Sequence, residues 1–204
     1  MAGAFVRSGV QAAVRAVAQV LVSPLVLLWV IYHRASGRNT LFTSLSQVLS
    51  LWPGKSGAYL RRAFYQLTLA ECGNNVLIEF GTLLNYPTTR IARGVYIGTN
   101  CTLGMVSIGE GTMIGSNVDI LSSRRQHRRE GTRLLGAESG TFTHVSIGPN
   151  TWIGNGAVIM ANVGRDCTVG AATVVVKDVA DGATVVGNPA RVVGMIAAAE
   201  SRTS

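Results

Sequence analysis

The stretch IGPNTWIGNGAVIMANVGRDCTVGAATVVVKDV, residues 147–179, decides the fold because its aliphatic residues recur every six positions. This period fits neither an amphipathic helix, with about 3.6 residues per turn, nor a strand, with a period of about two. It fits a short strand followed by a tight turn, repeated along the chain. Hexads begin at Ile147, Ile153 and Ile159 and, after a four-residue step, at Val163, Val169 and Val175.

The same period extends back to Cys72 with one step of seven residues and one of five. Earlier hexads begin at Cys72, Ile78, Leu84, Ile91, Ile97, Leu103, Ile108, Ile114 and Ile120. The fifth position is usually small or β-branched, as in Val76, Thr82, Cys101, Thr112, Val118, Thr151, Ala157, Cys167 and Thr173. Three strands with their turns would close one triangular coil, with the aliphatic residues inside and Gly or Asn at turns of positive φ. The sequence therefore predicts a β-solenoid.

These repeats, together with VVGNPARVV at 185–193, resemble the hexapeptide-repeat acyltransferases, and most closely the sugar and polysaccharide O-acetyltransferases. The resemblance covers roughly residues 72–195 and is specific to the superfamily, not to a substrate. It implies a left-handed parallel β-helix, a homotrimer with active sites between neighbouring prisms, and acetyl-CoA as the donor. The hand is implied by the resemblance alone, since parallel crossovers are otherwise right-handed.

An arginine-rich insertion, LSSRRQHRREGTRLLGAESGTFTH at 121–144, interrupts the period. Long irregular segments in compact repeat domains are often functional. The family has a catalytic histidine near the start of a loop at this place, so the resemblance makes His127 the candidate general base. An imidazole titrates near neutral pH and can accept the proton of an attacking hydroxyl. His144 is the rival base. Alternatively, His127 is only a solvated loop residue and His144 packs at the base of the loop.

The resemblance also implies contacts with the acceptor and with CoA. Asn85, in LLNYPTTR, corresponds to an asparagine near the acceptor, unless it is only a turn residue. The loop arginines Arg124, Arg125 and Arg128 suit an anionic acceptor or the CoA phosphates, unless they form a flexible charged surface. The implied CoA contacts are Trp152, Gly154, Asn155, Ala171, Ala172, Val176, Lys177 and Arg191. Ala172 and Val176 stand where the family usually has Gly and Thr.

The amino-terminal region has a different character. Residues 16–32, AVAQVLVSPLVLLWVIY, carry no charge and are marginally long enough to span a membrane. Pro24 is expected to kink a helix there, while Trp29 and Tyr32 are typical of an interfacial anchor. We expect a membrane anchor; a soluble packing helix and a cleaved signal peptide are the alternatives.

A second helix is expected over AYLRRAFYQLTL, residues 58–69, with Arg61 and Arg62 on its polar face. Positive charges are more frequent after the apolar run than before it, which places the carboxyl-terminal side in the cytoplasm if the run spans. The charges that follow the run are Arg34, Arg38, Lys55, Arg61 and Arg62.

Composition narrows the function classes. The 204 residues carry a formal net charge of +8, which suits nucleic acid, anionic lipid or an anionic small substrate. Aromatic content of 6% and the lack of a nucleic-acid-reading motif speak against nucleic acid. Cys72, Cys101 and Cys167 form no metal or disulfide pattern. A metal-dependent hydratase of this superfamily needs three histidines, and outside the helical region only two occur.

The sequence therefore predicts a mainly β protein in three parts. Residues 1–70 form a helical, membrane-associating region, and residues 71–186 form a left-handed β-helix acyltransferase domain with its catalytic insertion at 120–145. Residues 187–204 form a cap and tail with a short C-terminal helix. We expect acetyl-CoA-dependent transfer to a saccharide hydroxyl of a polysaccharide or glycolipid precursor, at the cytoplasmic face of a membrane, without metal or nucleic acid. A non-catalytic trimeric membrane scaffold and an amino-sugar N-acyltransferase are the alternatives.

Overall fold

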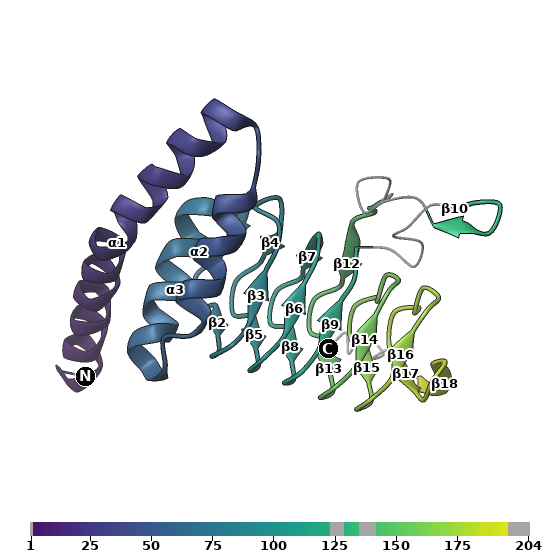
Figure 1. Cartoon of the computed structure of the whole chain (residues 1–204). Coiled ribbons are helices and arrows are strands. Elements are labelled where there is room, and N and C mark those ends of the chain that lie inside the picture. The colour runs from purple at the N-terminus through teal and green to yellow at the C-terminus, as the bar shows by residue number, and fades with distance from the viewer. Residues whose placement is uncertain (1, 123–128, 135–141, 196–204) are drawn as a thin grey trace.

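Three helices cover one end of a stack of short strands. The computed structural model describes residues 2–122, 129–134 and 142–195. The helices are α1 (Ala2–Ser36), α2 (Thr40–Ser50) and α3 (Gly54–Thr68). α3 packs against α1 on one side and against the first strands of the stack on the other, and the stack continues away from the helices (Figure 1).

The stacked strands form three sheets, one along each face of a prism, and the chain visits the sheets in turn. Sheet A contains β1 (Glu71–Cys72), β4 (Arg90–Ile91), β7 (Val106–Ile108) and β12 (Val145–Ile147). Sheet B contains β2 (Leu77–Ile78), β5 (Tyr96–Ile97), β8 (Met113–Ile114), β13 (Trp152–Ile153), β15 (Thr168–Val169), β17 (Ala183–Val186) and β18 (Arg191–Met195). Sheet C contains β3 (Leu83–Leu84), β6 (Thr102–Leu103), β9 (Asp119–Ile120), β14 (Val158–Ile159) and β16 (Val174–Val175). The expected fold class, a mainly β solenoid of hexapeptide repeats, is confirmed.

The core of the prism consists of the residues that begin the hexads. In sheet B the parallel register places Ile97 beside Ile114 and Ile153 beside Val169, and all four are fully buried. Burial of each such side chain contributes about 1.5–3 kcal/mol. The small fifth residues are buried at the corners, where threonine hydroxyls donate to carbonyls of the next coil.

All irregular steps in the repeat fall at one edge of the prism, the corner where the chain passes from sheet C to sheet A. The steps from sheet A to sheet B and from sheet B to sheet C are always six residues. At the C–A corner the core positions are instead separated by seven, five, four and four residues: Leu84 to Ile91, Leu103 to Ile108, Ile159 to Val163 and Val175 to Val179. The insertion between Ile120 and Ile147 lies at the same corner, so this edge tolerates chains of different length.

The two consecutive arginines of α3 are buried, which corrects the expectation that they lie on a polar helix face. Arg61 is 0% exposed and Arg62 is 7% exposed. The Arg61 guanidinium donates to the carbonyls of Trp52 at 2.7 Å, Leu49 at 3.2 Å and Ile78 at 2.9 Å. The last carbonyls of α2 lack partners within their own helix, so the buried cation adds a donor at Leu49 and, through Ile78, joins the end of α2 to the first coil.

The far end of the solenoid closes with an antiparallel strand. Residues 191–195 form β18, which pairs antiparallel with β17, so the expected short C-terminal helix does not include these residues. The physical reason is that β17 would otherwise leave an unpaired edge at the end of sheet B. The rest of the predicted tail, 196–204, lies outside the described residues.

Candidate active site

The C–A corner gathers the candidate acceptor residue and the base of the insertion. Asn85 directly follows β3, Met105 follows β6, and the insertion follows β9, so all three leave sheet C at the same edge in successive coils. Asn85 is half-buried, and its backbone N–H donates to the carbonyl of Leu103 at 3.0 Å. The repeat therefore places Asn85 on the same edge as the predicted catalytic loop.

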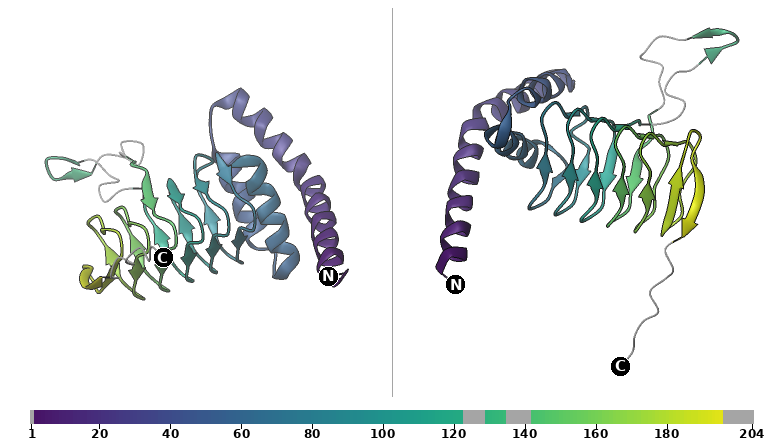
Figure 2. Two further views of the ribbon diagram at one scale, coloured as in Figure 1. Left: turned by 180° about the vertical axis from the view of Figure 1, so that it is seen from behind. Right: turned by 90° about the horizontal axis from the view of Figure 1, so that it is seen from below.

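Hydrogen bonds fasten both ends of the insertion to the prism. The N–H of Thr143 donates to the carbonyl of Ser122 at 2.5 Å, and the Ser122 hydroxyl accepts from the N–H of Met105 at 2.8 Å. The rings of Phe142 and Tyr86 lie 6.3 Å apart between centroids, which ties the loop base to the segment after Asn85. Farther out, β10 (Arg129–Glu130) and β11 (Arg133–Leu134) form a hairpin that stands away from the prism (Figure 2).

His144, the rival base, is exposed just before β12. Its Nε2 lies 2.7 Å from the hydroxyl oxygen of Ser107, which belongs to the neighbouring strand β7. This hydrogen bond occupies one ring nitrogen and orients the imidazole. His127, the preferred candidate, lies outside the described residues, and so do Arg124, Arg125 and Arg128.

Sequence reasoning missed Ser107 and Ser122, although the spacing contained a signal for the first. Counting hexads across the insertion aligns Ile108 with Ile147, and the structure has this pairing. The alignment puts Ser107 beside Ser146. Because His144 precedes Ser146 by only two residues, it also brings Ser107 close to His144. Nothing in the repeat indicates that Ser122 should close the loop.

Four of the candidate CoA residues lie together at the corner between sheets B and C. Gly154 and Asn155 follow β13, and Ala171 and Ala172 follow β15 in the next coil. A side chain at Gly154 would place its Cβ 2.6 Å from the backbone nitrogen of Ala171, so the two coils meet here only because the residue is glycine. The N–H of Ala172 donates to the carbonyl of Asn155 at 2.9 Å.

The other candidate CoA residues are not brought to that corner. The side chain of Trp152 lies on the outer face of sheet B and is 52% exposed. Val176 and Lys177 follow β16 at the C–A corner, and Arg191 begins β18. The eight residues are therefore spread over two edges and one face of a single chain, and an extended ligand that touches them all would have to follow that surface.

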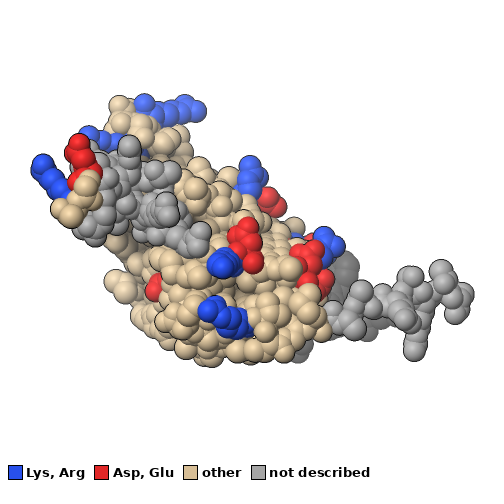
Figure 3. Space-filling view, turned by 90° about the vertical axis from the view of Figure 1, so that its right-hand side faces the viewer, with Lys and Arg blue, Asp and Glu red and all other residues tan. Residues whose placement is uncertain are grey.

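The described charges do not form a continuous basic patch over the end of the solenoid, where Lys and Arg side chains lie beside Asp and Glu (Figure 3). Within residues 2–122, 129–134 and 142–195, no three His, Cys, Asp or Glu side chains are placed to hold a metal ion together. Burial raises the pKa of the Cys101 and Cys167 thiols, so these core residues stay protonated.

The stacked coils and the six-residue repeat define a hexapeptide-repeat protein, and comparisons with known proteins support the same assignment. The family described as hexapeptide repeat of succinyl-transferase matches residues 134–161 and 144–177. A putative acetyltransferase of Saccharomyces cerevisiae is 30% identical over 147 residues, which cover 67% of this chain and 71% of the relative. The chain belongs to the hexapeptide-repeat acetyltransferases.

Two further proteins are similar over different shares of their lengths. Nodulation protein L of Rhizobium leguminosarum bv. viciae is 39% identical over 127 residues, 53% of this chain and 64% of that protein. The chain thus spans less than two thirds of that relative. A maltose O-acetyltransferase from Clostridium difficile 630 superposes with a TM-score of 0.63 at 21% identity, covering 77% of this chain and 86% of the other; this likeness concerns the fold.

Proposed function

We propose that this protein is an acetyl-CoA-dependent O-acetyltransferase that modifies a saccharide hydroxyl on a polysaccharide or glycolipid precursor. One observation carries the proposal: the C–A corner brings Asn85 and both fastened ends of the insertion to one edge of the prism. Family membership supports an acyl-CoA donor, and one protein of the same fold is named a maltose O-acetyltransferase.

In the proposed reaction, acetyl-CoA supplies an acetyl group activated as a thioester. His127 takes the proton of the acceptor hydroxyl while its oxygen attacks the thioester carbonyl, and the proton then goes to the departing CoA sulfur. The hydrogen bond between Ser107 and His144 favours a positioning role for His144 at the loop base, because one of its ring nitrogens is already bonded. Lys177 and Arg191 are exposed cations that suit the CoA phosphates.

A homotrimer is part of the proposal, and the outer face of sheet B supports it. Leu77, Tyr96, Met113 and Trp152 occupy successive outward positions in register along this sheet. Met113 and Trp152 are more than half exposed in the single chain. A ridge of large apolar side chains on a soluble surface is typical of a subunit contact, and Trp152 would then lie at the boundary between protomers.

Membrane association at the cytoplasmic face completes the proposal. Residues Ala12–Ser36 form a helix that is long and apolar enough to cross a membrane by length and composition. Buried Arg61 and Arg62 are no longer free surface charges, so the charge bias after this run depends on Arg34, Arg38 and Lys55. The proposed acetyl donor also favours the cytoplasmic side of the membrane, because acetyl-CoA is a cytoplasmic substrate.

The test is CoA release by the purified full chain with acetyl-CoA and candidate glycans. We expect turnover with a hydroxyl acceptor, and a fall of about 10²–10⁴-fold in His127→Ala, because a positioned general base contributes that factor. The matched variant His144→Ala should lose much less, since it removes an orienting contact at the loop base.

Three outcomes would contradict parts of this proposal. Turnover that survives His127→Ala but not His144→Ala would transfer the base role to His144. Acetylation of amino sugars with no activity on hydroxyls would make the protein an N-acyltransferase. No turnover together with no calorimetric binding of acetyl-CoA would favour the non-catalytic trimeric scaffold.

A further inference from the structure

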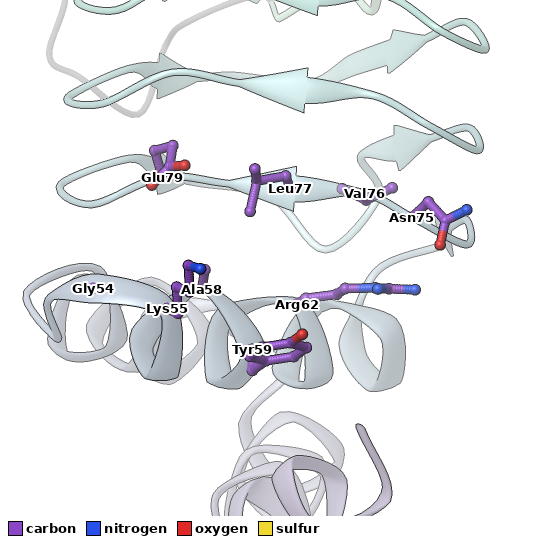
Figure 4. A pocket seen from close by; sticks show the side chains of 9 residues that line it. All are labelled: Gly54, Lys55, Ala58, Tyr59, Arg62, Asn75, Val76, Leu77 and Glu79. Atoms are coloured by element: carbon purple, nitrogen blue, oxygen red, sulfur yellow. The ribbon is translucent and has the colours of Figure 1, made fainter. Parts of the chain in front are cut away.

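A cavity of about 480 Å³ lies between α3 and the first coil of the solenoid, away from the insertion. Its polar lining comes from Lys55, Tyr59 and Arg62 of α3 and from Asn75 and Glu79 of the first coil. Figure 4 shows the Arg62 side chain extending along the gap from α3 toward Asn75. Nothing in the proposed acetyl transfer uses this space.

Arg62 is a buried cation without the partners that its neighbour has. It is 7% exposed, and its Nε and Nη2 atoms have no hydrogen-bond partner among the described residues. Arg61, the preceding residue, instead donates to four backbone carbonyls. Burial is the main cause that lowers the pKa of Arg62, and the nearby charge of Arg15 lowers it further. Two cations therefore lie close together, one of which, Arg62, lines the cavity.

Arg15 reaches the same place from α1. Its Nη2 donates to the side-chain oxygen of Asn75 at 3.2 Å, while its Nε is buried and has no partner in the part of the chain that the structure describes. Buried guanidinium donors are unfavourable unless an acceptor satisfies them. Glu79 is the carboxylate in the lining, and the described residues show no ion pair between it and a lining cation. Arg62 thus lines the cavity with unsatisfied donors, and Arg15 contacts the cavity wall through Asn75.

We propose that this cavity is a binding site for a phosphate ester, held by the guanidinium group of Arg62 with Lys55 at the cavity wall, while the charge of Arg15 lies nearby beside Asn75. Guanidinium forks match phosphate oxygens in pairs. A phosphate monoester carries up to two negative charges and several acceptor oxygens, so one group can satisfy the free donors of Arg62 and also offset the nearby charge of Arg15. A single carboxylate would offset only one of the two charges.

The phosphate can belong to a soluble phosphate ester or to a lipid headgroup. Arg15 is on α1, whose outward surface is apolar. A lipid headgroup at a membrane surface would therefore offer the same phosphate group to this cavity as a soluble ester. The inference goes beyond the proposed acetyl transfer and does not depend on it, because the cavity contains none of the candidate catalytic or CoA residues.

The first measurement is thermal unfolding of the full chain in neutral detergent, with rising inorganic phosphate against sodium chloride of matched ionic strength. A ligand that binds only the folded state raises the unfolding midpoint in a saturable way. We expect this shift in the wild type and its loss in Arg62→Gln. Arg38→Gln, which removes one exposed positive charge outside the cavity, is the matched control and should respond as the wild type does.

The second measurement separates the sources by flotation with vesicles of phosphatidylcholine alone or mixed with phosphatidic acid. Greater flotation with phosphatidic acid, lost in Arg62→Gln and kept in Arg38→Gln, supports a lipid headgroup. A phosphate-dependent midpoint without this lipid effect supports a soluble phosphate ester.

The proposal is overturned if neither measurement depends on phosphate, or if Arg62→Gln responds like the wild type. Without phosphate, Arg62→Gln should unfold at or above the wild-type midpoint; a large fall would mean that Arg62 serves only the fold.

Discussion

At the scale of single residues, the turns of the solenoid depend on side chains that tolerate positive φ. Asparagine or aspartate occupies most such non-glycine positions: Asn75, Asn100, Asn117, Asn150 and Asp166. Ala172 is the exception, with φ of +55°. A Cβ in this region costs about 1–2 kcal/mol, whereas short polar side chains and glycine tolerate it. Ala172 therefore carries local strain at the corner that contains the candidate CoA residues.

We predict that Ala172→Gly stabilises the protein. Relief of the strain exceeds the extra backbone entropy of glycine in the unfolded chain, which leaves a net gain of roughly 0.5–1 kcal/mol. Denaturant unfolding without acetyl-CoA measures it. Ala171→Gly is the matched control, because Ala171 is adjacent, exposed and free of positive φ, and it should lose a few tenths of a kcal/mol or change little. Equal effects of the two substitutions would contradict the strain.

At the scale of elements, neighbouring coils are joined by hydroxyl groups at the fifth position of the hexad as well as by backbone pairing. The buried Thr151 hydroxyl donates to the carbonyl of Gly164 at 2.8 Å and accepts from the N–H of Cys167 at 3.2 Å. Thr82 repeats the arrangement with Gly98 and Cys101. The preference for small β-branched residues at this position thus has a polar component as well as a steric one.

Thr151→Val is expected to lower the free energy of unfolding by about 1–3 kcal/mol, because it leaves a buried carbonyl and a buried N–H each without this partner. Thr151→Ser keeps the hydroxyl and should cost less. Both variants can be compared by urea denaturation. If valine were tolerated as well as serine, packing alone would explain the residue type.

The sequence encodes the solenoid and much less of the site, for identifiable reasons. Six-residue spacing fixes which residue faces the core at every coil, so the fold class followed from it directly. Burial of Arg61 could not be foreseen, because the carbonyls that it satisfies belong to the end of α2, to the segment between α2 and α3, and to the first coil. The candidate site positions came from resemblance, and a single chain leaves Lys177 and Asn155 on different edges.

At the scale of the whole molecule, α1 has two unlike faces. Ala18 and Val22 are buried among the three helices, whereas Val17, Leu21 and Leu28 are more than half exposed and recur at helical spacing on an outward side of the helix. α1 runs alongside the other helices at the end of the solenoid (Figure 2). The outward face has the composition of a helix that lies against lipid, while the inward face is already covered by protein.

We therefore predict that substitution of the outward face releases the protein from membranes while the fold persists. Leu21→Ser with Leu28→Ser should move a substantial share of the protein from the membrane pellet to the supernatant after cell fractionation, since each substitution removes apolar area available to lipid. Val192→Ser with Val193→Ser is the matched control: both valines are 61% exposed, but they lie on β18 at the far end of the solenoid. Deleting residues 1–35 should release the protein as well. If the deletion variant stays completely in the pellet, α1 is not the anchor. If the deletion variant is released but the double serine variant stays in the pellet, the result favours a helix that spans the membrane over one whose outward face alone contacts lipid.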